Sequence, residues 1–274
     1  MKPRLLSILL LTFCTVLYSQ SGSRNIVKTY QVPSSKQAVA VDANYFFVIN
    51  NSSITKHLKK DGKLVSSWVD NDSLIHHMNS GIIIDGKLYV VNSNYPQAPM
   101  ASSVEIFDPA TLTHIDNHSF GIWNGSATWL DEYKGFWYVA FAHYTGKGAE
   151  PGKLNSWTRL VKFDDQWRQI ESWIYPKELI DKFGSKSNSG GVILPDGKIL
   201  CTGHDNYELY LLEFPSKGYT LVWRDTISVG SFGQGIASEI ENDSILIYGI
   251  VKNESKVVVS RIGYYSALDC KITY

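Results

Sequence analysis

The sequence predicts an all-β protein that folds as a five-bladed β-propeller, and two observations support that prediction. A pattern of small residues, a short apolar run, a turn and a second apolar run recurs five times along the chain. Each recurrence is followed by an alternating third strand, and four of them by a fourth strand. Four-stranded units of about 40–50 residues, repeated in series, are typical of propeller blades.

The five recurrences are hairpins that begin the predicted blades. They span 37–50, 80–91, 126–141, 190–200 and 234–248. Their anchors, Ala38, Gly81, Ala127, Gly191 and Gly235, are spaced 43, 46, 64 and 44 residues apart. Asp-Gly joins the two apolar runs of the second and fourth hairpins, which is a strong signal for a tight turn. We therefore expect Asp42, Asp85 and Asp196 to serve turn geometry.

The third and fourth strands complete the blades. Third strands are expected at 53–58, 103–108, 158–163, 208–214 and 256–262, and fourth strands at 63–69, 112–120, 167–174 and 219–229. The fifth unit lacks a fourth strand, whereas the segment 25–32 precedes the first unit and has the pattern of an outer strand. We expect this N-terminal strand to close the ring, because closure hides sheet edges that would otherwise be exposed.

The third blade carries insertions in its long interval. Thr145–Ser156 is rich in glycine and predicts a loop. Pro176–Phe183 predicts a short helical insertion in blade 3, with proline in its first turn and Gly184 at its end. These insertions are either a lid on one face of the propeller or a surface decoration.

The amino terminus has the pattern of a processing signal. Residues 1–4 are basic, residues 5–17 are nearly all apolar, and Ser19 offers a small residue for cleavage. This predicts a signal peptide at 1–19 and a single propeller domain at 20–274, which is secreted or periplasmic. The apolar run is too short for a membrane span, and no later segment approaches the ~18 apolar residues that a span needs.

The charge composition limits the classes of binding partner that we expect. Lysine plus arginine and aspartate plus glutamate number 26 each, with no long run of one sign. We therefore expect no nucleic-acid partner and no membrane partner. The expected partner is a small-molecule or carbohydrate ligand, bound by a monomer.

Residues at the ends of the inner strands converge on the axis of a propeller, where ligand sites tend to lie. The segments that precede each first strand and follow each second strand contain amides, hydroxyls and imidazoles. Asp205 is almost the only carboxylate among them. We therefore do not expect glycoside hydrolysis by two facing carboxylates.

Histidine is the strongest chemical signal at these positions. His143 and His204 occupy matching positions in adjacent blades, and His77 and Gln234 lie at the other strand ends. Three imidazoles and an amide could hold a divalent metal ion and leave a position open for a substrate. Alternatively, one imidazole acts as general base, with Tyr144 or a second histidine as general acid. Both arrangements suit elimination or isomerisation of a sugar acid or a similar small polar substrate.

Further polar and aromatic residues are candidates for substrate binding. They are Asn79, Asn94, Tyr95, His118, Asn188, Asp205 and Gln234. Packing is the alternative role for each histidine, and His118 lies on a predicted outer strand. The alternative function is a non-catalytic carbohydrate- or peptide-binding propeller, in which Tyr95, Trp123 and Tyr144 form the contact surface with the axial amides.

Seven segments resemble a group of secreted bacterial five-bladed propeller proteins that carry the provisional description "cycloisomerase-like". They are 77–81, 93–96, 100–106, 118–121, 141–144, 187–191 and 202–205. The resemblance covers most of the chain after the signal peptide and implies the fold but little chemistry. More distantly, the histidine-rich axis is similar to that of propeller polysaccharide lyases, which use His and Tyr, or His with a bound metal. Those enzymes usually have seven blades, so no residue is carried over from them.

Overall fold

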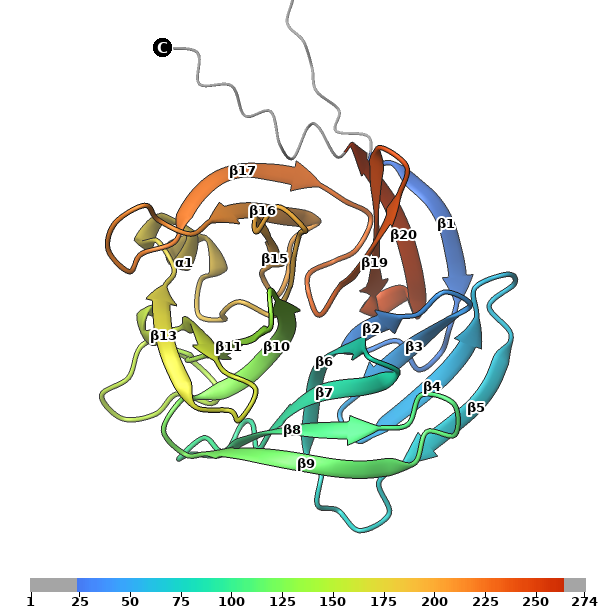
Figure 1. Ribbon diagram of the computed structural model, residues 1–274, viewed down its shortest axis with the longest axis horizontal. Helices are drawn as coiled ribbons and strands as arrows, with labels where there is room; N and C mark the ends of the chain where they lie inside the picture. The colour runs from blue at the N-terminus through green and yellow to red at the C-terminus, as the bar shows by residue number, and fades with distance from the viewer. Residues whose placement is uncertain (1–23, 264–274) are drawn as a thin grey trace, which may run out of the picture.

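The computed structural model describes residues 24–263, which form five four-stranded antiparallel sheets around a central axis (Figure 1). The first blade contains β2 (Ala38–Val41), β3 (Tyr45–Asn50), β4 (Ser53–Leu58) and β5 (Leu64–Val69). The second contains β6 (His77–Ile84), β7 (Lys87–Ser93), β8 (Ser102–Phe107) and β9 (His114–Gly121). The third contains β10 (Ser126–Tyr133), β11 (Phe136–Ala142), β12 (Arg159–Phe163) and β13 (Gln169–Ile174).

The fourth and fifth blades complete the ring. The fourth contains β14 (Gly190–Ile193), β15 (Ile199–Thr202), β16 (Glu208–Glu213) and β17 (Val222–Ser228). The fifth contains β18 (Ala237–Glu241), β19 (Ser244–Val251), β20 (Lys256–Gly263) and β1 (Ile26–Gln31). The predicted five-bladed propeller is therefore confirmed. The predicted signal peptide at 1–19 lies outside the described residues and stays a prediction, as does export.

The N-terminal strand closes the ring as predicted. β1 pairs antiparallel with β20, so that Thr29 lies opposite Val258, and the two ends of the described chain share one sheet. Tyr30 in this strand is buried and packs on Phe46 of the first blade, with 4.6 Å between the ring centroids. Its hydroxyl donates a hydrogen bond to the carbonyl of Lys59 (2.6 Å). Backbone pairing and side-chain packing thus join blade five to blade one.

The core lies between neighbouring blades, where the apolar faces of the sheets meet. Blades three and four share a cluster that includes Trp129, Leu160 and Tyr210. The inner strands approach closely at Gly191, where a Cβ atom would lie 2.5 Å from Cε2 of Trp129. Glycine is required there because a larger residue would push the two blades apart.

The helix α1 (Lys177–Phe183) lies in the connection from β13 to β14 (Figure 1). The prediction of a short helix that follows the fourth strand of blade three is confirmed. Leu179, Ile180 and Phe183 are buried against the cluster shared by blades three and four. The helix therefore covers the seam between these blades. No helix in residues 24–263 is long and apolar enough to cross a membrane.

The carboxylates predicted in hairpin turns have the expected roles. Asp42 Oδ1 accepts hydrogen bonds from the amides of Asn44 (2.8 Å) and Tyr45 (2.7 Å). Asp85 and Gly86 both have positive φ angles, +48° and +72°, as the first and second residues of a tight hairpin turn require. These acidic residues therefore stabilise the backbone of the hairpin turns.

Asp131 is a buried carboxyl that connects blades three and four. Its Oδ2 accepts a hydrogen bond from the amide of Ile193 in β14 (2.6 Å), and its Oδ1 accepts one from the amide of Glu132 (2.7 Å). Burial raises the pKa of Asp131 from 3.8 to about 7, against the effect of these hydrogen bonds. The folded state therefore keeps a proton that the unfolded chain releases near pH 4.

This pKa predicts a loss of stability as the pH rises. Between about pH 4 and pH 7 the folded state binds more protons at Asp131 than the unfolded state, so the free energy of unfolding falls with increasing pH. The difference between the two pKa values corresponds to at most about 4 kcal/mol. We expect Asp131→Asn to flatten the pH dependence of urea unfolding across this range relative to the unsubstituted protein. Parallel curves for the two proteins would contradict the assignment.

Candidate functional site

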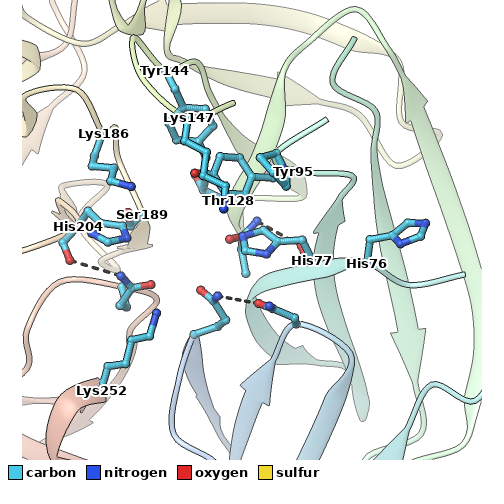
Figure 2. A pocket seen from close by; sticks show the side chains of 15 residues that line it. His76, His77, Tyr95, Thr128, Tyr144, Lys147, Lys186, Ser189, His204 and Lys252 are labelled. Atoms are coloured by element: carbon cyan, nitrogen blue, oxygen red, sulfur yellow. Dashed lines mark hydrogen bonds between the residues drawn. The ribbon is translucent and has the colours of Figure 1, made fainter. Parts of the chain in front are cut away.

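A cavity of about 390 Å³ opens at one end of the propeller axis. All five blades contribute to it near the beginning of their inner strands, through Gln37, Asn79, Thr128, Ser189 and Gln234. Figure 2 labels Thr128 and Ser189 among them. These five side chains form a polar ring around the axis, because each inner strand starts at the same face of the propeller. The closed fold thus gathers five polar side chains that are far apart in the sequence.

The amides of this ring are held by hydrogen bonds. Gln37 donates to Asn51 Oδ1 (2.7 Å), and Asn79 donates to the carbonyl of Ala127 (2.7 Å). The side chain of Gln234 donates to the carbonyl of His204 (3.3 Å). These contacts orient the remaining amide atoms, so the ring is a prearranged set of hydrogen-bonding groups.

One wall of the cavity is aromatic. The ring centroid of Tyr95 lies 5.0 Å from that of His77 and 4.9 Å from that of Tyr144. Burial raises the pKa of both tyrosines above the usual value, so both phenols are protonated at neutral pH. The wall therefore offers apolar ring faces and protonated hydroxyl groups.

His77 is uncharged at neutral pH. Burial lowers its pKa to about 4, and the positive charges of Lys252 and Lys147 add to that effect. A neutral imidazole donates one hydrogen bond and accepts another. His77 thus contributes polar contacts to the cavity rather than charge.

Three lysines, which the sequence analysis did not single out, line the cavity. Figure 2 shows Lys147, Lys186 and Lys252 extending toward it from different sides. Within residues 24–263, none of the three ammonium groups forms an ion pair with a carboxylate, and no Asp or Glu lines the cavity. Lys252 follows β19 directly, at a position equivalent to the predicted strand ends. The mouth of the cavity is therefore positively charged, although the whole chain is neutral.

His204 lies in the cavity next to a carboxylate that orients it. Its Nδ1 is 2.5 Å from Oδ1 of Asp205, which is exposed and does not itself line the cavity. A carboxylate at Nδ1 favours the tautomer that carries its proton there and leaves the Nε2 lone pair free. His204 can therefore accept a proton at Nε2.

His143 lies outside the cavity lining and is almost completely buried. Its Nε2 is 3.1 Å from the carbonyl of Asn124, and its Nδ1 is 3.2 Å from Oε2 of Glu150, in ion-pair rather than hydrogen-bond geometry. Burial, together with the charge of Lys153, lowers the pKa of His143. The structure thus separates His143 from His77 and His204.

The predicted metal centre is not assembled by these residues. His77 and His204 line the cavity, whereas both ring nitrogens of His143 face protein groups. In the part of the chain that the structure describes, no group of three His, Cys, Asp or Glu side chains could hold a metal ion. The three-histidine ligand set therefore does not fit a metal ion in this arrangement.

Three predicted substrate-binding residues have structural contacts instead. His118 stacks on Trp167 in the outer part of the molecule (5.2 Å between centroids). Asn94 donates to the carbonyl of Pro99 (2.9 Å) and accepts from the amide of Ala101 (2.8 Å). None of the three, including Asn188, lines the cavity.

Asn188 is completely buried, and its side chain is fully hydrogen-bonded. Its Oδ1 accepts hydrogen bonds from the indole of Trp129 and from the hydroxyl of Tyr175 (2.8 Å). Its Nδ2 donates to the carbonyls of Gly190 (3.0 Å) and Thr202 (2.8 Å). The sequence pattern located Asn188 near the axis but could not show that the core uses every polar atom of its side chain.

We expect Asn188→Ala to destabilise the fold by about 2–5 kcal/mol, because two buried donors and two carbonyls lose their partner. Urea unfolding measures this change. Ser189→Ala is the matched control, since Ser189 is the next residue and lines the cavity. We expect it to change stability by no more than about 0.5 kcal/mol. An Asn188→Ala protein of unchanged stability would contradict the structural role.

Comparison with known proteins supports the fold. No family model matches the chain. The crystal structure of Myxococcus xanthus glutaminyl cyclase is similar over 87% of this chain and 96% of that chain, with 12% identity and a TM-score of 0.56. The GH43 β-xylosidase/α-arabinofuranosidase CoXyl43, from a compost microbial metagenome, is similar over 88% of this chain and 94% of that chain, with 10% identity and a TM-score of 0.55. At these identities the likeness shows the fold alone.

One sequence match is closer but short. A segment of 90 residues is 41% identical to a cell wall isozyme of β-fructofuranosidase from Zea mays. It covers 30% of this chain and only 15% of that protein, which is too little to establish a family. These comparisons do not support the predicted likeness to cycloisomerase-like proteins or to polysaccharide lyases.

Proposed function

We propose that the axial cavity binds the carboxylate of an acidic sugar and that the protein removes the proton next to this carboxylate, as a lyase or isomerase. The observation that carries the proposal is the set of three lysines without carboxylate partners around a cavity that no Asp or Glu of the described residues lines. An anionic ligand gains from these charges, whereas a neutral sugar does not. The carbohydrate-active names of the GH43 neighbour and of the short sequence match favour a sugar as the rest of the ligand.

Two side chains that line the cavity, His204 and Tyr144, support the proposed reaction. A uronate loses the proton on C5 to Nε2 of His204, and the electron pair of the C–H bond forms an enediolate on the carboxylate. Lysine ammonium groups stabilise that charge as it develops. For elimination, the C4–O bond then breaks, a C4=C5 double bond forms, and the hydroxyl of Tyr144 gives its proton to the departing oxygen. For isomerisation, the proton returns to the sugar instead.

Glycoside hydrolysis by two carboxylates has less support. It requires an acid and a carboxylate on opposite sides of the bond that is cleaved. Among residues 24–263 no Asp or Glu lines the cavity, and Asp205, next to the lining residue His204, is engaged with its imidazole. The cavity therefore lacks, among the described residues, the pair of acidic groups that this reaction needs.

The second candidate is a non-catalytic carbohydrate-binding propeller. The prearranged ring of amides and the Tyr95–Tyr144 wall favour it, because stacking and oriented hydrogen bonds suffice to hold a sugar. Trp123, which is largely exposed, is absent from the cavity lining. Product analysis separates this candidate from the enzyme.

The charge proposal predicts selectivity for acidic sugars. We expect the protein to bind oligogalacturonate but not the neutral galactose oligomer of the same length, in calorimetry at low salt. Ala substitution of Lys147, Lys186 or Lys252 should weaken oligogalacturonate binding about three- to tenfold each, and added salt should weaken it further. Lys217→Ala removes an exposed lysine outside the cavity and should have no effect. Equal affinity for both oligomers would contradict the proposal.

The catalytic proposal predicts a separate loss of turnover. We expect His204→Gln to lower the rate of C4=C5 double-bond formation from an acidic oligosaccharide, followed by ultraviolet absorbance, at least about 100-fold. Binding of the same oligosaccharide should change much less, because the lysines remain. Tight binding without any product from the unsubstituted protein, by absorbance and by mass spectrometry for isomers, would favour the binding module instead.

A further inference from the structure

Glu150 is a buried carboxylate that joins three segments behind the cavity wall. It lies in the loop 145–157, is 8% exposed and does not line the cavity. Its Oε1 accepts a hydrogen bond from the amide of Met100 (2.9 Å). Its Oε2 lies 3.2 Å from Nδ1 of His143 and 3.3 Å from Nζ of Lys153. A carboxylate is rarely buried unless it is paired, so its removal from water has to be offset by these contacts.

The Met100 contact connects two loops that both reach the cavity. The loop 94–101 carries Tyr95, and its ends are held together by Asn94 through hydrogen bonds to Pro99 and Ala101. The loop 145–157 carries Lys147 and follows Tyr144 directly. Glu150 is the side chain that bonds the second loop to the backbone of the first.

The same two loops also meet at Gly148. A Cβ atom on Gly148 would lie 2.5 Å from Cε2 of Tyr95, and the residue has a φ angle of +86°. The backbone therefore packs closely against the Tyr95 ring, with no room for a side chain. Lys147 is the residue next to this contact, so the position of its backbone depends on how the two loops are held together.

His143 provides a fixed base for this arrangement. Its amide donates to Oγ1 of Thr158 (3.1 Å), and its ring lies between the carbonyl of Asn124 and the carboxylate of Glu150. Because His143 directly precedes Tyr144, the contact with Glu150 folds the loop back onto the residue that places Tyr144 in the wall.

We propose that Glu150 is a positioning residue that locks the loops 94–101 and 145–157 into one wall of the cavity, with His143 as its partner rather than as a group that acts on the ligand. The consequence for binding rests on the proposed function, since it assumes that Lys147 and the two tyrosines contact an acidic sugar. The locking of the loops does not depend on any ligand.

Hydrogen–deuterium exchange of the unliganded protein tests the locking. We expect Glu150→Ala to increase exchange at least about tenfold in peptides that cover 94–101 and 145–157. Glu150→Gln should retain most of the protection, because its amide oxygen still accepts from Met100. The matched control is Glu105→Ala: Glu105 is equally buried, is paired with His114 (2.8 Å) in blade two and lies away from the cavity. It should leave both loops protected.

Binding of oligogalacturonate tests the consequence. We expect Glu150→Ala to weaken it about tenfold, Glu150→Gln to restore most of the affinity, and Glu105→Ala to leave it unchanged, in proteins whose circular dichroism shows an intact fold. Unchanged loop exchange in Glu150→Ala would overturn the locking, and loosened loops with unchanged affinity would overturn its consequence for binding. If the unsubstituted protein does not bind oligogalacturonate, the proposed function fails, and the exchange experiment alone decides whether Glu150 locks the loops.

Discussion

The backbone pairing of β1 with β20 holds both ends of the described chain in one sheet, and the axial cavity depends on it. Gln37 enters the cavity from blade one and Gln234 from blade five, so the two residues stay together only while the ring is closed. Tyr30 reinforces the pairing from the side, through its packing on Phe46. Without the closing strand, β20 of blade five would expose an unpaired edge and the polar ring would open.

Within that closed ring, acidic and basic residues are used differently. Many carboxylates are engaged by the backbone or by a neighbouring side chain, as Asp42 is in a turn, Asp131 between blades and Glu150 between loops. The lysines of the cavity have no such partners among the described residues. A chain with equal numbers of acidic and basic residues thereby concentrates positive charge at one mouth. The mouth is positively charged mainly because the carboxylates lie elsewhere, and less because lysines are numerous.

The fold was predictable because the same pattern of strands and turns is repeated along the sequence. Alternating strands recur in every blade, Asp-Gly turns mark two of the five hairpins, and the missing outer strand of the fifth unit indicated the closure by β1. The strand-end rule also placed His77, Tyr144 and His204 near the axis. It failed for His143, whose ring nitrogens face Asn124 and Glu150 instead of the cavity, because a position at a strand end does not fix the direction of the side chain. Lys147 and Lys186 escaped prediction because they lie in irregular connections, where no periodicity indicates direction.

The three cavity lysines all lie outside the strands: Lys147 and Lys186 in loops, and Lys252 in the short 3₁₀ turn η2 (Lys252–Glu254). The sheets therefore provide a frame, while the residues that carry the charge belong to segments with few constraints from the core. In evolution, such a molecule can change the ligand it selects by exchanging connections without altering a single blade. The same separation makes it a suitable scaffold for protein engineering, because loop grafts at this mouth leave the packing between the sheets intact.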